Sequence, residues 1–248
     1  AEYRYSTDSG ANWSGWSVDG LQTHSPVSTT VEIEATTSAL VDSATANRMQ
    51  FRIWDSTGGE LVSQAFPIQV DGAAPSSAVS LSPAMPPAGW YSATVTVTIS
   101  ATDGSGSGVK ESYMRLDGSG PFQPGGTLAV EASGMHSLEF YSSDVAGNQE
   151  EVQTRHNYFG VDREPPTVTA IADKLGAWAK PPVVVTLQAH DGEGSGVAIV
   201  EYRLEGSASW MAGNEIMVDG ADGSYTYEYR ARDLAGNTSA AQRITLGL

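Results

Sequence analysis

Six aspartates are the side chains in this sequence whose types and spacing best suit a chemical role. Three of them lie at or just after the ends of candidate strands in one stretch of the chain. The other three lie at the equivalent places in a second, similar stretch. They are Asp71, Asp103 and Asp144, followed by Asp162, Asp191 and Asp233. Carboxylates that meet in groups of three, together with loop carbonyls, are the hard oxygen ligands that Ca²⁺ prefers. The sequence therefore offers two candidate calcium sites.

A second interpretation of the same aspartates needs no metal. Asp144 and Asp233 each open the motif Asp-x-Ala-Gly-Asn. An aspartate in such a turn accepts hydrogen bonds from nearby backbone amides and so stabilises the turn itself. The sequence contains no complete Asp-x-Asp-x-Asp-Gly calcium loop. Both interpretations, calcium binding and turn bracing, remain open from the sequence.

The sequence contains no motif that specifies an enzyme active site. None of the four histidines stands at zinc-site spacing from another, and there is no His-Glu-x-x-His motif. The segment Gly104–Gly108 resembles a Gly-x-Ser-x-Gly nucleophile elbow, but the corresponding segment Gly192–Gly196 begins Gly-Glu-Gly. There is no cysteine to act as a nucleophile, form disulfides or bind metals as thiolate. We therefore predict that the chain is not an enzyme.

Two tryptophans near the start of the chain, Trp13 and Trp16, are candidates for ligand binding. Flat aromatic rings stack against sugars, which suggests a carbohydrate site. Tryptophans also pack within folded domains, and the three-residue spacing places these two around a turn. Carbohydrate binding and internal packing are thus the two alternatives for this pair.

The charge balance limits the classes of partner. The chain has 29 acidic and 13 basic residues, which gives a net charge of −16. Such a surface repels nucleic acid phosphates and anionic lipid headgroups. No apolar run is long enough to span a bilayer, and no signal peptide opens the chain. We expect no nucleic acid partner and no membrane insertion.

Internal repeats indicate the elements that position these residues. Asp144 and Asp233 stand 89 residues apart, and Asp103 and Asp191 stand 88 apart. Before each of these aspartates apolar and polar residues alternate, as in Val95-Thr-Val97-Thr-Ile-Ser-Ala101. Period-two alternation is typical of half-buried antiparallel strands. Short strands in units of about 90 residues predict an all-β chain of tandem immunoglobulin-like β-sandwiches arranged end to end.

Short proline-containing segments divide the chain into three predicted modules, at residues 1–71, 72–161 and 162–248. In such a sandwich, the loop after the second strand and the last hairpin loop lie at the pole where the linker enters. We therefore expect each group of three aspartates to converge at one pole of its module. Short linkers stiffened by proline favour a rod about 100 Å long, at roughly 35–40 Å for each sandwich.

The first module differs from the other two. The segment Glu2-Tyr-Arg-Tyr5 matches the third strand of the later modules, so residues 1–71 are predicted to lack the first two strands. One explanation is that the chain is a fragment. The other is a natively open sandwich, completed by a strand from another protein chain along Glu2–Thr7 or near Val31–Ala35.

The repeated blocks resemble bacterial immunoglobulin-like tandem repeat domains. Ala-Thr-Asp…Ser-Gly-Val, Gly-x-His-Ser-Leu-Glu-Phe and Asp-Val-Ala-Gly-Asn carry this resemblance, and the opening Tyr3–Trp16 is similar to fibronectin-type modules. The resemblance implies a secreted or bacterial cell-surface protein. Its expected function is structural, as a stalk, spacer, adhesin arm or filament or envelope unit. The alternative is a carbohydrate- or ligand-binding accessory module of a secreted hydrolase or adhesin.

Overall fold

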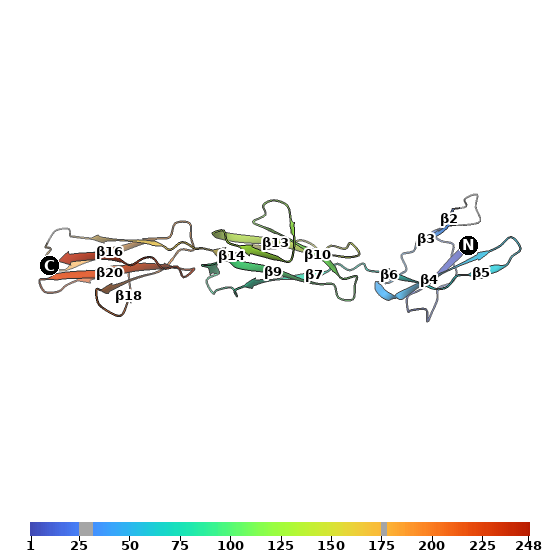
Figure 1. Cartoon of the computed structure of the whole chain (residues 1–248), viewed down its shortest axis with the longest axis horizontal. Helices are drawn as coiled ribbons and strands as arrows, with labels where there is room; N and C mark the ends of the chain where they lie inside the picture. The colour runs from blue at the N-terminus through green and yellow to red at the C-terminus, as the bar shows by residue number, and fades with distance from the viewer. Residues whose placement is uncertain (25–31, 175–177) are drawn as a thin grey trace. The chain divides into compact units, whose positions relative to one another are not determined.

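The computed structural model of the chain describes residues 1–24, 32–174 and 178–248. Every element of regular structure in these ranges is a β-strand (Figure 1), which confirms the predicted all-β class. The described residues include no helix that is long and apolar enough to cross a membrane. Val31, at the start of one of the two strand edges considered above, lies outside the described residues.

Backbone contacts divide the chain into two compact units. The first unit consists of Ala1–Ala78, Ser100–Tyr113 and Tyr141–Val152. The second consists of Val79–Ile99, Met114–Phe140 and Gln153–Leu248. The module boundaries at residues 71 and 161, and the end-to-end arrangement, stay predictions.

The strands of residues 1–71 form one antiparallel sheet, which we call the first sheet, and a separate two-stranded hairpin. In the first sheet β4 lies at the centre and pairs with three shorter strands. Its members are β1 (Glu2–Ser6), β4 (Ser43–Trp54), β5 (Glu60–Val62) and β6 (Phe66–Val70), and the hairpin is β2 (Leu21–His24) with β3 (Glu32–Ala35). Tyr3 lies opposite Phe51, and Tyr5 lies opposite Met49, so these side chains share one face of the sheet.

The strands between Ser76 and Val161 form a five-stranded and a three-stranded sheet. The five-stranded sheet has the order β11 (Gln123–Pro124), β10 (Val109–Leu116), β13 (Gly134–Asp144), β14 (Gln153–Val161) and β8 (Trp90–Tyr91). The three-stranded sheet has the order β12 (Thr127–Val130), β9 (Val95–Thr102) and β7 (Ser76–Ser82). Strand β8 runs parallel to β14 with Trp90 opposite Gly160. A Cβ at Gly160 would lie 2.3 Å from the Trp90 ring, so only glycine lets the tryptophan lie across β14.

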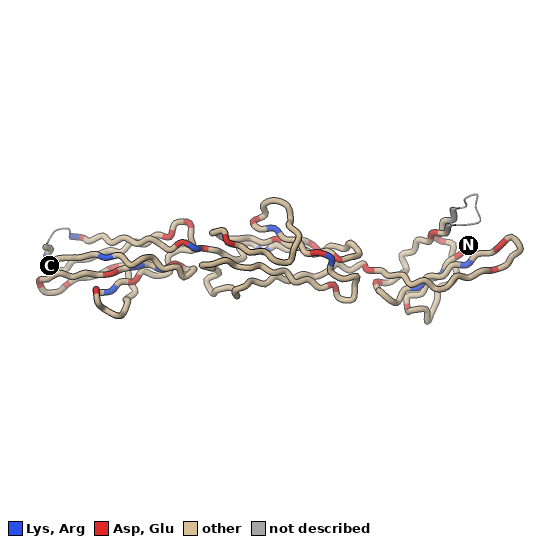
Figure 2. Tube along the Cα trace, viewed as in Figure 1, with Lys and Arg blue, Asp and Glu red and all other residues tan. Residues whose placement is uncertain are grey.

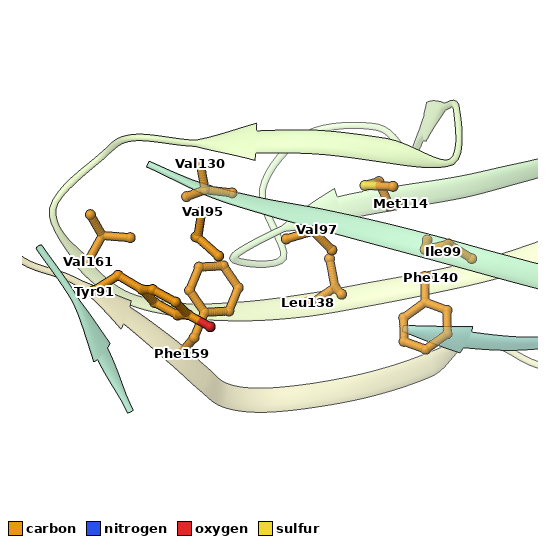
Figure 3. Packing of buried hydrophobic residues seen from close by; sticks show 10 residues of the cluster. All are labelled: Tyr91, Val95, Val97, Ile99, Met114, Val130, Leu138, Phe140, Phe159 and Val161. Carbon is orange, nitrogen blue, oxygen red and sulfur yellow. The ribbon is translucent and has the colours of Figure 1, made fainter. Parts of the chain in front are cut away.

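A hydrophobic core lies between these two sheets (Figure 3). Val95 and Val97 on β9, and Leu138 and Phe140 on β13, are fully buried. The intervening positions on β9 are threonines, which point away from the core because successive strand residues face opposite sides. The alternation seen in the sequence therefore predicts the buried residues of this core correctly.

The strands between Thr167 and Gly247 repeat the arrangement with a second core. A three-stranded sheet has the order β15 (Thr167–Ala172), β16 (Val183–His190) and β19 (Glu215–Val218). A four-stranded sheet has the order β18 (Met211–Ala212), β17 (Val197–Leu204), β20 (Ser224–Asp233) and β21 (Gln242–Gly247). Val183, Val185 and Leu187 of β16 pack with Tyr229 and Ala231 of β20. These strands have the positions expected from the repeats.

Candidate functional site

The structure brings the six aspartates into two clusters. The first aspartate cluster is Asp71 after β6, Asp103 after β9 and Asp144 at the end of β13. The second aspartate cluster comprises Asp162 after β14, Asp191 after β16 and Asp233 at the end of β20. In each cluster three carboxylate oxygens, one from each residue, lie within 4.8 Å of one another. The predicted convergence is therefore present in the geometry.

The first aspartate cluster also braces its own loops. The backbone amides of Ser107 and Gly108 donate to Asp71 Oδ2 at 2.6 Å and to Asp103 Oδ2 at 2.7 Å. Asp144 Oδ1 accepts the amides of Gly147 and Asn148, both at 2.7 Å. Each aspartate therefore anchors a loop backbone, as the turn-bracing interpretation requires.

The second aspartate cluster makes most of the same contacts at the equivalent positions. The amides of Ser195 and Gly196 donate to Asp162 Oδ2 at 2.7 Å and to Asp191 Oδ2 at 2.6 Å. Asp233 Oδ1 accepts the amide of Asn237 at 2.8 Å. One hydrogen-bond network is thus built twice, from residues 88 to 91 positions apart in the sequence.

Two asparagines, whose role the sequence did not reveal, fasten the preceding linker to each cluster. Asn148 Nδ2 donates to the Asp71 carbonyl at 2.9 Å and to Asp144 Oδ2 at 2.8 Å. Asn237 Nδ2 donates to the Asp162 carbonyl at 2.9 Å and to Asp233 Oδ2 at 2.8 Å. The last residue of Asp-x-Ala-Gly-Asn therefore does more than complete a turn, because it also holds a chain segment about 75 residues earlier in the sequence.

A glycine in each cluster keeps space beside the carboxylates. A Cβ at Gly106 would lie 2.6 Å from Asp103 Oδ2 and 2.9 Å from Asp71 Oδ2. A Cβ at Gly194 would lie 2.7 Å from Asp162 Oδ2 and 2.8 Å from Asp191 Oδ2. The side chain of any other residue would clash with these oxygens. The second glycine of Asp-Gly-x-Gly-Ser-Gly is therefore required by the cluster as well as by the turn.

The two clusters concentrate negative charge without a salt-bridge partner among the described residues. Acidic residues outnumber basic ones along the chain (Figure 2). Among the described residues, none of the six carboxylates takes part in a salt bridge. Asp103 Oδ1 is shielded from solvent and has no hydrogen-bond partner in the described part of the chain. This oxygen is the one buried polar side-chain atom of the described residues that the protein leaves unpaired.

One aspartate of each cluster has a shifted pKa, and the two shifts have opposite directions. Burial raises the pKa of Asp191, and repulsion from Asp162 and Asp233 raises it further, against the hydrogen bond from Gly196. The side chain and then the backbone amide of Ser107 lower the pKa of Asp71 by donating to its carboxylate.

Trp13 and Trp16 lie against arginines of the first sheet. The Arg4 guanidinium lies 4.7 Å from the centre of the Trp13 ring and 4.6 Å from that of Trp16. Arg52 lies 4.4 Å from Trp16 and 4.9 Å from Trp54. The rings and guanidinium groups therefore alternate, and both predicted ligand-binding tryptophans contribute to cation–π packing.

The same kind of contact recurs in the later strands. Arg115 lies over Phe122 at 4.5 Å, and Arg203 lies over Trp210 at 4.5 Å. In both cases the aromatic residue follows its arginine by seven positions. This spacing was available in the sequence as a signal for structural packing of aromatic residues.

Comparisons with known proteins bear on the fold alone. No protein-family model matches the chain, and no curated protein is similar to it in sequence. Among solved structures, fibronectin(III)-like modules of Clostridium thermocellum CbhA have 17% identity and a TM-score of 0.33, over 69% of this chain and 94% of theirs. A cytokine receptor complex gives 18% identity and a TM-score of 0.32, over 69% and 96%.

A third similar structure is the N-terminal eight immunoglobulin domains of Down Syndrome Cell Adhesion Molecule. It has 14% identity and a TM-score of 0.27, over 99% of this chain and 36% of that one. At these identities the comparisons add no assignment of function. The chain is similar in fold to fibronectin(III)-like and immunoglobulin modules.

Proposed function

We propose that this chain is a non-enzymatic structural repeat region of an extracellular bacterial protein, such as a stalk, an adhesin arm or a filament or envelope unit. In this proposal its sandwiches follow one another end to end, and each aspartate cluster binds Ca²⁺. The observation that carries the proposal is the duplicated network that ties Asp71 and Asp162 to the loops that follow them in the sequence.

The network restrains each linker at two points. The Asp162 carboxylate accepts the Ser195 amide, while the Asp162 carbonyl accepts the Asn237 side chain. Rotation about the backbone of this residue would break one or both bonds. Proline follows at Pro165 and Pro166, and it restricts φ further. A linker restrained in this way enters the following module in a fixed direction, as a spacer requires.

Calcium binding is supported by the charge and by the unpaired oxygen. Three carboxylates within 4.8 Å repel one another unless a proton or a cation lies between them. Ca²⁺ binds six to eight oxygens at about 2.3–2.6 Å. A carboxylate that already accepts amide hydrogen bonds has further lone pairs, so it remains a suitable ligand. Asp103 Oδ1 would gain the partner that the protein does not give it. The space beside Gly106 and Gly194 keeps side chains away from the same oxygens.

Carbohydrate binding at Trp13 and Trp16, the alternative function, is not part of the proposal. Sugar platforms require open aromatic faces, whereas Arg4 stacks on both of these rings. The cation–π contacts favour a packing role for the pair.

Calorimetric titration of the metal-free chain with Ca²⁺ tests the metal site. We expect two ions per chain, and one after either Asp103→Asn or Asp191→Asn. Asp222→Asn, at an exposed loop position, is the matched control and should leave both ions bound. Absence of binding, or equal binding by all three variants, would leave turn bracing as the only role of the aspartates. The spacer role is tested separately by the length of the chain in solution.

A further inference from the structure

The first sheet has one face that carries apolar side chains and no charged ones, which we call the apolar face. Pairing across the strands places Tyr3 opposite Phe51, Ile53 opposite Leu61, and Met49 opposite Phe66. The arginines of β1 and β4 alternate with these residues, so they point to the opposite face. The members of the apolar face are Tyr3, Tyr5, Met49, Phe51, Ile53, Leu61, Phe66 and Ile68.

This face is buried at one end and exposed at the other. Tyr3 and Met49 are only 4% and 7% exposed, but Ile53, Leu61 and Phe66 are 39%, 66% and 38% exposed. Three large apolar side chains on neighbouring strands are thus accessible together. A contiguous apolar patch of this kind marks an interaction surface more often than chance exposure does.

The internal repeats allow a residue-by-residue comparison of this face. The 89-residue period places Ile53 at the position of Ser142 on β13 and of Ala231 on β20. Those two residues are fully buried, at 0% exposure, whereas Ile53 is 39% exposed. The equivalent position therefore lies under a covering layer in both later modules and lacks one among the described residues of the first.

The later modules also show what the covering layer is. Strands β7, β9 and β12 cover the β13 face, with Val95, Val97 and Ile99 of β9 at most 6% exposed. The described residues of 1–71 contain only the first sheet and the β2–β3 hairpin. In the middle module the segment from β7 to β9 also supplies β8, which pairs in parallel with the last strand, β14. The corresponding last strand of the first sheet, β6, pairs only with β4 among the described strands.

We infer that the apolar face binds an extended polypeptide segment with alternating apolar side chains, of the type found at residues 76–102 of this chain. Such a segment covers Ile53 and Leu61 with aliphatic side chains and adds a strand to the free edge of β6. Because the apolar face carries no charge, the strand binds without desolvating an ionised group. The segment that we infer belongs to another protein chain.

A peptide of residues 93–103, labelled with a fluorophore and titrated with the intact chain, tests this inference. We expect saturable binding, and a peptide with Val95→Ser, Val97→Ser and Ile99→Ser should bind at least tenfold more weakly. In the protein, Leu61→Lys should also weaken binding at least tenfold. Val62→Lys is the matched control, because Val62 is 42% exposed, lies opposite Arg52 and faces the other side of the sheet.

If the free peptide associates with itself, a fusion of the segment to the chain tests the same inference. Residues 76–102 fused before Ala1 through a flexible linker should reduce binding of an apolar dye to the chain, and the triple-serine version of the fused segment should not. Equal peptide binding by the two lysine variants, or unchanged dye binding in the fusion, would overturn the inference. Concentration-dependent dimerisation abolished by Leu61→Lys would overturn it in favour of a second copy of the chain as the occupant.

Discussion

Replacing Asn237 by alanine removes the side chain that ties the linker to the second aspartate cluster. Asn237 Nδ2 donates to the Asp162 carbonyl at 2.9 Å and to Asp233 Oδ2 at 2.8 Å. Asp233 is 2% exposed, so water cannot fully replace the lost donor. A hydrogen bond to a neutral acceptor contributes about 1 kcal/mol and one to a charged group about 1.5–3 kcal/mol. The expected loss is therefore about 3 kcal/mol.

Native-state hydrogen exchange read by mass spectrometry is the appropriate assay, because it assigns the loss to particular strands. We expect amides of β20 and β21 to exchange with a free energy of opening about 3 kcal/mol lower. For a module of this size the loss corresponds to a fall of roughly 15 °C in the melting temperature. Asn214→Ala is the control within the same module, since Asn214 is exposed and, among the described residues, only its backbone carbonyl takes part in a hydrogen bond.

The control should change stability by less than about 0.5 kcal/mol. If Asn237→Ala costs no more than Asn214→Ala, the asparagine does not restrain the linker, and the structural basis of the proposed spacer is wrong. Asn148→Ala makes the same test in the other cluster, where the two distances are also 2.9 and 2.8 Å.

Three further predictions follow from the packing and the charges. Gly194→Ala places a Cβ 2.7 Å from Asp162 Oδ2 and should cost about 1–3 kcal/mol in a denaturant melt, whereas an unchanged midpoint would show that the loop has room for it. Phe140→Ala empties a fully buried position and should cost about 3–5 kcal/mol, which calorimetry measures. The raised pKa of Asp191 means that its ionisation opposes folding: in metal-free solution this group's contribution to stability should fall as the pH rises from the ordinary carboxyl pKa through the raised one. Asp191→Asn should remove that part of the pH dependence, and melts of both proteins that run parallel over this pH range would contradict the assignment.

Much of the fold was predictable because the repeats carry strong local patterns. Alternation over Val95, Val97 and Ile99 fixes which side of β9 is buried, and the positions of Asp103 and Asp144 after strands place both at one pole. Each of these inferences uses only strand geometry and sequence spacing. They needed no knowledge of how distant loops approach one another.

The features that the sequence did not reveal depend on such approaches. Asn148 is a turn residue by motif, and its bond to the Asp71 carbonyl arises only when two loops 77 positions apart come together. Gly106 is likewise a flexible turn residue until the Asp71 carboxylate lies beside it. Ile53 continues the apolar alternation of β4, yet it is 39% exposed because no described strand covers it.

Small-angle X-ray scattering of the intact chain, with Ca²⁺ and with chelator, tests the central claim most directly. An end-to-end array about 100 Å long, built from sandwiches of roughly 35–40 Å, has a radius of gyration near 30 Å, compared with roughly 18 Å for a compact chain of this length. We predict the larger value with Ca²⁺ and a broader distribution of distances with chelator. A radius near 18 Å in both conditions would contradict the proposed spacer.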